Sequence, residues 1–201
     1  LDRNIYEDLL RLDYAKKILQ FCSDLSVMPE IYTDGKIYTL RCFYDNFSKL
    51  VGSQFEYVAE LIRQSRTPVD SLQDLLDKSM QPVEKLNVFF REPQEGTLLL
   101  HHLESYDVSV TGSLTNNVEI GSPTASKGHA LATLATQLGL SANNVMAIGD
   151  ADNDISMLKY AACSVAMGNA IPSVVATARY QTSSNRDSGV AAAIHKYALR
   201  S

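Results

Sequence analysis

Apolar residues recur along the chain with two spacings, one typical of helices and one typical of strands. Between residues 6 and 24 they fall every three or four positions, which predicts an amphipathic helix. Residues 29–40 form two β-rich runs around Asp34-Gly35, a pair that favours a tight hairpin turn. Comparable patterns predict helices at 54–64, 68–78 and 95–105, and strands at 85–90, 106–110 and 117–120.

The second half of the chain alternates more regularly. Ser126 can cap a helix that stops at Gly139, with four apolar residues on one face: Leu131, Leu134, Ala135 and Leu138. Strands are then predicted at 145–148, 164–167 and near 180, and helices at 155–161, 171–177 and 187–199. Such alternation is typical of a parallel sheet wrapped by helices. We predict an α/β fold in which residues 1–113 form a mixed α/β domain and residues 114–201 a parallel one.

The composition indicates a folded protein and argues against two classes of partner. Apolar residues make up 45% of the chain and charged residues 20%, enough to bury a core. The net charge of −5 argues against nucleic-acid and anionic-membrane partners, because both bind basic surfaces. No apolar run approaches the roughly 18 residues of a membrane span. The three cysteines are widely spaced, so we predict free thiols and a cytoplasmic location.

The clearest chemical signal follows the predicted strand at 145–148. Gly149 lets the backbone turn, and Asp150, Asp152, Asn153 and Asp154 come directly after it. Oxygen ligands at the carboxyl end of a strand suit Mg²⁺, which usually takes one or two carboxylates with waters and phosphate oxygens. The alternative is a helix N-terminus rich in capping residues, and Asp152 fits that role equally well.

Two further motifs fit the same edge of the sheet. Lys127 stands at the head of the helix capped by Ser126, where free amide groups and the helix dipole favour an anion. A lysine in this position is most often only solvated, but it lies one strand–helix unit before Asp150. The Gly168-Asn169 pair also leaves a strand, and it fits either the rim of the site or a plain strand-to-helix turn.

These motifs resemble a known family. Ser126-Lys127-Gly128, the run from Ala147 to Asp154, and Ala166 to Ala170 resemble the C-terminal half of Cof-type phosphatases. These are haloacid dehalogenase-like (HAD) hydrolases with a Rossmann-like parallel core and a mixed α/β cap, which would be residues 1–113 here. The resemblance implies an aspartate that attacks a phosphate monoester, with Mg²⁺ as cofactor.

The resemblance also implies a role for individual residues. Asp150 would be the metal ligand, and Lys127 and Asp154 would be catalytic. Lys127 and Asn153 would bind the phosphoryl group of a small phosphorylated metabolite such as a sugar phosphate.

The chain departs from the family in one respect. The family's nucleophile lies in an Asp-x-Asp-Gly-Thr segment before the cap, and this sequence has none. Without the strands that surround that segment, the strand before Asp150 would expose an unpaired edge. We therefore expect the chain to lack the N-terminal segment of a longer protein, to be inactive alone, and to bind that segment as a partner. The alternatives are a non-catalytic module that binds a phosphorylated ligand or a protein, and a related phosphotransferase.

Overall fold

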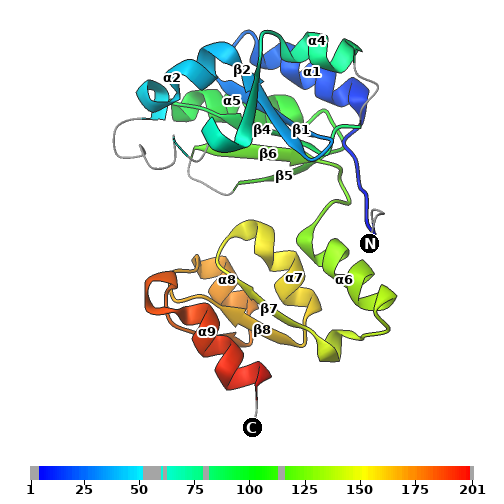
Figure 1. Cartoon of the computed structure of the whole chain (residues 1–201), viewed down its shortest axis with the longest axis vertical. Helices are drawn as coiled ribbons and strands as arrows, with labels where there is room; N and C mark the ends of the chain where they lie inside the picture. The colour runs from blue at the N-terminus through cyan, green and yellow to red at the C-terminus, as the bar shows by residue number, and fades with distance from the viewer. Residues whose placement is uncertain (1–4, 52–59, 61–62, 79–81, 113–115, 200–201) are drawn as a thin grey trace. The chain divides into compact units, whose positions relative to one another are not determined.

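The computed structural model describes residues 5–51, 60, 63–78, 82–112 and 116–199. The chain divides into two compact units (Figure 1). The N-terminal unit is Asp8–Thr124, and the C-terminal unit begins at Ala125 and includes the residues before Asp8. This boundary lies beyond residue 113, where we placed it, because the strand at Asn117–Gly121 pairs within the sheet of the N-terminal unit.

The N-terminal unit is built on a six-stranded sheet with the order β3-β2-β1-β4-β6-β5. Its strands are β1 (Met28–Thr33), β2 (Lys36–Leu40), β3 (Arg66–Val69), β4 (Lys85–Phe89), β5 (Ser109–Thr111) and β6 (Asn117–Gly121). All neighbours are antiparallel except β2 and β3, which are parallel. The predicted hairpin is confirmed, since Asp34 and Gly35 both have positive φ between β1 and β2.

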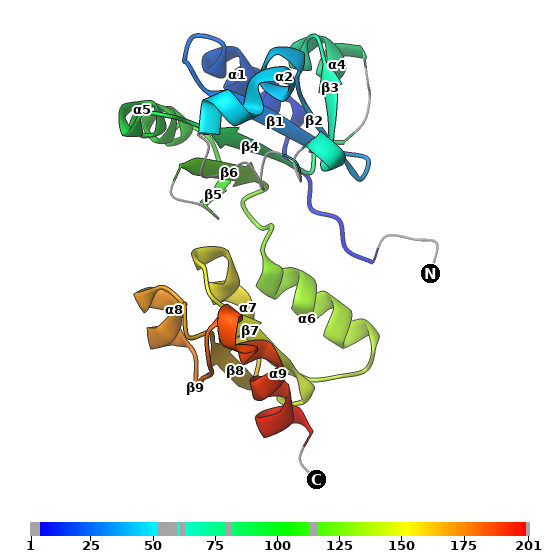
Figure 2. The same ribbon diagram turned by 60° about the vertical axis from the view of Figure 1, so that its left-hand side comes forward.

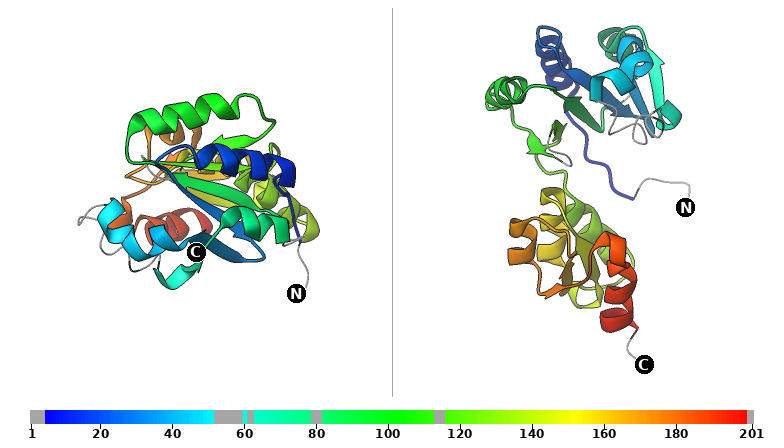
Figure 3. Two further views of the ribbon diagram at one scale, coloured as in Figure 1. Left: turned by 90° about the horizontal axis from the view of Figure 1, so that it is seen from above. Right: turned by 90° about the vertical axis from the view of Figure 1, so that its left-hand side faces the viewer.

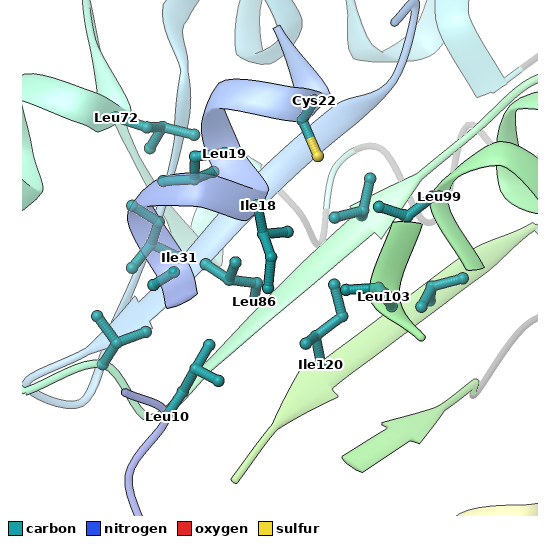
Figure 4. Packing of buried hydrophobic residues seen from close by; sticks show 14 of the residues in the cluster. Leu10, Ile18, Leu19, Cys22, Ile31, Leu72, Leu86, Leu99, Leu103 and Ile120 are labelled. Atoms are coloured by element: carbon teal, nitrogen blue, oxygen red, sulfur yellow. The ribbon is translucent and has the colours of Figure 1, made fainter. Parts of the chain in front are cut away.

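Helices cover one face of this sheet. They are α1 (Leu12–Cys22), α2 (Arg41–Val51), α4 (Leu72–Lys78) and α5 (Pro93–Leu103). Figure 3 shows α1, α4 and α5 side by side over the strands. Buried side chains of α1 and α5 meet those of β1, β4 and β6 (Figure 4): Ile18, Leu99, Leu103, Ile31, Leu86 and Ile120.

Two predicted helices of this unit differ from the structure in extent, and a third falls mostly outside the described residues. The helix predicted from residue 6 begins at Leu12, because Leu10 is held in a β-bridge to Val83. The helix predicted at 68–78 begins at Leu72, since the preceding residues form β3 beside β2. Most of the helix predicted at 54–64 lies outside the described residues.

The face of the sheet opposite the helices contains a buried polar network. Strand residues alternate between faces, so Glu30 points away from the core that Ile31 enters. The Arg66 guanidinium donates to both Glu30 oxygens at 2.9 and 3.1 Å, and the two side chains are 12% and 3% exposed. Asn87 donates to Glu30 at 3.4 Å, and Asn117 donates to Asn87 at 2.9 Å. The network therefore joins four strands.

Replacing Glu30 with alanine should destabilise the N-terminal unit by about 3–5 kcal/mol, because it leaves the Arg66 charge buried without its partner. Urea unfolding followed in this unit measures the loss. Replacing Glu30 and Arg66 together with methionine should restore most of the stability. As a control, Asp74→Ala breaks the exposed Asp74–Lys78 pair and should cost about 0.5 kcal/mol or less. A Glu30→Ala variant no less stable than the double variant would contradict this assignment.

The C-terminal unit has a three-stranded parallel sheet, which confirms the predicted α/β alternation. Its strands are β7 (Met146–Gly149), β8 (Cys163–Ala166) and β9 (Tyr180–Gln181), in that order. Its helices are α6 (Lys127–Gln137), α7 (Ile155–Tyr160), α8 (Pro172–Thr177) and α9 (Gly189–Ala193). Figure 2 shows α6 beside α7, in agreement with the close contacts between them.

Helix α6 begins and ends as predicted, but its apolar face is only partly buried. Ala135 is buried and Leu131 packs against the core of the unit, whereas Leu134 and Leu138 are 40% and 63% exposed. Within the described residues, β7 likewise pairs only with β8. Among its described residues, the C-terminal unit therefore has an open strand edge at β7 and exposed leucines on α6.

Two further sequence predictions concern cysteines and membranes. All three cysteines are free, as predicted. None of the helices in the described residues combines the length and the apolar run that a membrane span requires.

Candidate active site

The candidate site is built on the loop that leaves β7. After Gly149, the chain turns through Asp150 into a short 3-10 turn, η3 (Asp152–Asp154), so that Asp154 folds back toward the strand. Asp154 Oδ2 accepts from the backbone amides of Asp150 at 2.9 Å and Ala151 at 3.2 Å. A Cβ at residue 149 would lie 2.5 Å from the Asp154 Cβ, so this return requires glycine. The predicted glycine turn therefore has a specific packing reason.

Lys127 approaches the same loop from α6. Its Nζ donates to Asp154 Oδ1 at 2.5 Å and to Asn153 Oδ1 at 3.4 Å. Ser126 caps the helix, as predicted, by accepting from the His129 amide at 3.1 Å. The structure thus brings Lys127 into direct contact with Asn153 and Asp154, which lie 26 and 27 residues further along the chain.

The position of Lys127 depends on a close approach of α6 to α7. The Gly128 amide donates to Ser156 Oγ at 3.0 Å, and a Cβ on Gly128 would lie 2.5 Å from the Ser156 carbonyl oxygen. Only glycine allows the two helices to meet here. Sequence reasoning singled out Lys127 but missed Ser156; the glycine after Lys127 was the available signal.

The Asp154 carboxylate is paired with the Lys127 ammonium. Burial alone would raise the pKa of Asp154, but the Lys127 ammonium and the amides of Asp150 and Ala151 lower it further than burial raises it. The Asp154 side chain is 6% exposed, so it is held as a buried carboxylate, while Lys127 is 49% exposed. Both Asp154 oxygens are used inside the protein, whereas the ammonium also reaches solvent. Lys127 therefore presents a fixed positive charge at the mouth of the loop.

Asp150 is oriented differently from Asp154. It is exposed at the edge of the sheet, and its Oδ2 accepts from Asn169 Nδ2 at 2.9 Å. Its backbone carbonyl accepts from the Ile171 amide at 3.0 Å. Asp152 points elsewhere, since its Oδ1 accepts from Ser173 Oγ at 3.1 Å. The two neighbouring carboxylates thus have separate surroundings.

The donor set can be tested against a magnesium ion. Within the part of the chain that the structure describes, no three His, Cys, Asp or Glu side chains gather as a complete metal site. Mg²⁺ needs no such group, because it commonly binds one or two carboxylates and completes its shell with water and phosphate oxygens. The Asp150 carboxylate faces solvent, and its hydrogen-bond donor, Asn169, is neutral. Asp150 is therefore suited to be one of those carboxylate ligands.

The structure also shows where the remaining residues singled out in the sequence lie. Gly168 and Asn169 follow β8 and contact the loops after β7 and β9, so they lie at the rim of the site. The Ser173 contact to Asp152 had no signal in the sequence pattern. The adjacent histidines His101 and His102 lie on α5, in the N-terminal unit.

Comparison with known proteins identifies the class. A profile of the haloacid dehalogenase-like hydrolase family matches residues 2–194. The chain belongs to this family.

Curated relatives include phosphatases. The chain is 38% identical over 128 residues to phosphatase YwpJ of Bacillus subtilis (strain 168), covering 61% of this chain and 44% of the relative. It is 43% identical over 93 residues to 5-amino-6-(5-phospho-D-ribitylamino)uracil phosphatase YcsE of the same organism, covering 46% and 37%. The chain thus matches less than half the length of these relatives.

Solved structures support the fold over almost the whole chain. A haloacid dehalogenase-like hydrolase from B. subtilis superposes with a TM-score of 0.79 at 27% identity, covering 95% of this chain and 72% of that one. The HAD subclass IIB sugar phosphatase BT4131 superposes with a TM-score of 0.79 at 18% identity, covering 99% and 71%. The second likeness concerns the fold alone.

Proposed function

We propose that this chain is part of a Mg²⁺-dependent phosphatase that hydrolyses small phosphorylated metabolites. The observation that carries the proposal is the contact of Lys127 with Asn153 and Asp154, in the same loop as the exposed carboxylate of Asp150. A fixed ammonium beside a cation ligand suits a phosphoryl group, whose oxygens carry the negative charge. The names of the matched relatives agree with this class of reaction.

The reaction would proceed through an aspartyl phosphate. A carboxylate oxygen of the nucleophile attacks phosphorus, and the ester P–O bond breaks as the leaving oxygen takes a proton from solvent and departs as the alcohol. Water then attacks phosphorus and gives up a proton to solvent as the aspartyl P–O bond breaks, which releases inorganic phosphate and restores the carboxylate. Mg²⁺, when bound, supplies Lewis-acid stabilisation of the phosphoryl oxygens.

The residues of this chain would divide the work between binding and positioning. Lys127 binds a phosphoryl oxygen and offsets the charge of the attacking carboxylate, and Asn153 binds a second oxygen. Asp154 keeps the Lys127 ammonium in place, and through the Asp150 amide it also fixes the loop that supplies the cation ligand. Asp150 holds the cation.

We further propose that the nucleophile lies in a segment not contained in residues 1–201. The sequence has no Asp-x-Asp-Gly-Thr motif, and its match to phosphatase YwpJ covers 44% of that relative. The open edge of β7 and the exposed Leu134 and Leu138 of α6 are a suitable surface for an added strand and its neighbours. The partner segment would therefore supply both the nucleophile and the cover for this surface.

The test compares two proteins in hydrolysis of p-nitrophenyl phosphate, with Mg²⁺ and with EDTA. One is residues 1–201, and the other is the product of the complete reading frame from which the chain comes. We expect Mg²⁺-dependent hydrolysis from the complete product and none from residues 1–201.

Three outcomes would contradict the proposal. Hydrolysis that persists in EDTA would show that the reaction does not need Mg²⁺. A complete product that binds phosphate but hydrolyses no ester would favour the non-catalytic module, which the absent nucleophile motif also fits. Acceptor-dependent transfer without hydrolysis would indicate a phosphotransferase.

A further inference from the structure

Three strand-exit loops meet at one side chain, Asn169. Its Nδ2 donates to Asp150 Oδ2 at 2.9 Å in the loop after β7. Its Oδ1 accepts from the Asn185 amide at 2.9 Å in the loop after β9. Because the amide oxygen faces a backbone donor, the amino group is the end that faces Asp150. The orientation of the Asn169 side chain is thus set by the third loop.

The backbone around Asn169 is held as firmly as its side chain. The Gly168 amide donates to the Ser183 carbonyl at 3.0 Å, and the Ile171 amide donates to the Asp150 carbonyl at 3.0 Å. A Cβ on Gly168 would lie 2.7 Å from the Ser184 nitrogen, so glycine is needed for the loops to approach. Asn169 therefore projects from a segment that is bonded on both sides.

We propose that Asn169 is a positioning residue that holds one oxygen of Asp150 so that the other is presented to the divalent cation. This inference rests on the proposed function, which makes Asp150 the cation ligand. A hydrogen bond to a ligating carboxylate fixes its rotation, and such supporting contacts contribute to metal affinity.

The neutrality of Asn169 matters for this role. A lysine or arginine there would also hold the Asp150 carboxylate, but it would offset the charge that attracts a cation. The structure instead places the lysine, Lys127, on Asp154, whose oxygens are used internally. The two carboxylates of the loop are thereby separated into one paired with a cationic side chain and one left for a metal ion.

The test is the binding of Mn²⁺ alone, measured by electron paramagnetic resonance on residues 1–201. Asn169→Ala should weaken Mn²⁺ binding by about tenfold or more, the usual effect of removing a contact that supports a metal ligand. Asn185→Pro removes the amide that bonds to the Asn169 oxygen but leaves the Asn169 and Asp150 side chains unchanged, so its effect should be smaller and in the same direction.

Ser173→Ala is the matched control. It removes the Ser173–Asp152 hydrogen bond, which joins the β7 loop to the segment after β8 without contacting Asp150. We expect Ser173→Ala to bind Mn²⁺ like the unsubstituted chain. Thermal melting without metal shows whether each variant is folded. The difference in Mn²⁺ affinity between Asn169→Ala and Ser173→Ala counts as support only if the two variants have similar melting temperatures.

The outcomes separate this inference from the proposed function. If Asp150→Asn abolishes Mn²⁺ binding while Asn169→Ala and Asn185→Pro bind normally, only the positioning role is overturned. Equal losses in Asn169→Ala and Ser173→Ala would also overturn it, because general loosening of the loops would explain both. Unchanged binding in Asp150→Asn, or no binding by the unsubstituted chain, would overturn the metal assignment and this inference together.

Discussion

Replacing Asp150 with alanine should lower kcat/KM for a phosphate monoester by about a thousandfold or more in a protein that contains this chain and the nucleophile segment. A bound cation contributes several kcal/mol to transition-state stabilisation, and about 4 kcal/mol corresponds to a factor of a thousand. The Asp150 carboxylate is exposed, so its loss should leave the fold intact. Steady-state hydrolysis of p-nitrophenyl phosphate over a range of Mg²⁺ concentrations measures the effect.

Asp152→Ala provides the matched control for Asp150. It removes one carboxylate of the same sign from the same loop, but that carboxylate bonds to Ser173 rather than to the groups around Asp150. We expect Asp152→Ala to retain most of the activity. Equal losses in the two variants would indicate that only the total charge of the loop matters, and full activity in Asp150→Ala would refute its role as a ligand.

Replacing Lys127 with methionine should reduce kcat/KM by about 10²–10³-fold, the usual effect of removing one group that stabilises the developing charge. Methionine keeps the length and apolar stem of the side chain but removes the ammonium. Asp154 would still accept from the amides of Asp150 and Ala151, which should preserve the loop. The same steady-state assay, with circular dichroism to check the fold, measures the loss.

Lys159→Met is the control for Lys127. Lys159 is an exposed residue of α7 in the same unit, and the change removes the same charge at a distance from the loop. We expect this variant to hydrolyse the ester like the unsubstituted protein. A Lys127→Met variant that matches Lys159→Met would mean that the ammonium has no part in the reaction.

The parts of the site that the sequence predicts are those defined by local rules. A glycine after an apolar strand indicates a turn at the sheet edge, and Ser126 before a helical pattern indicates a cap. Both are confirmed by the structure. The alternation of helices and parallel strands also explains why Lys127 and Asp154 meet. Lys127 begins the helix before β7 and Asp154 follows the end of β7, and in this arrangement both positions lie at the same edge of the sheet.

Contacts between loops could not be predicted in this way. The Asn169 bridge depends on Asn185, which follows a strand of only two residues, and the pattern carries no measure of how closely those loops pass. The glycine at 168 was a signal, but it fits an ordinary turn equally well. The role of Asn169 therefore follows only from the structure, which shows both of its partners, Asp150 and Asn185.

Tertiary pairing also overrode local pattern in the N-terminal unit. The pattern around residue 68 reads as helical, yet Arg66 lies in β3, where its guanidinium pairs with Glu30 two strands away. On α6 the apolar periodicity correctly predicts a helix but not what covers it, since Leu134 and Leu138 stay exposed within the described unit. Periodicity indicates an apolar face, and only the neighbouring elements decide whether it is buried.

The most direct test of the account is a crystal structure of the chain grown with Mg²⁺ and inorganic phosphate. We predict a cation on the second carboxylate oxygen of Asp150 and a phosphate that contacts both that cation and the Lys127 nitrogen. A cation bound elsewhere, or a structure in which the Lys127 nitrogen and the Asp150 carboxylate face separate cavities, would contradict it.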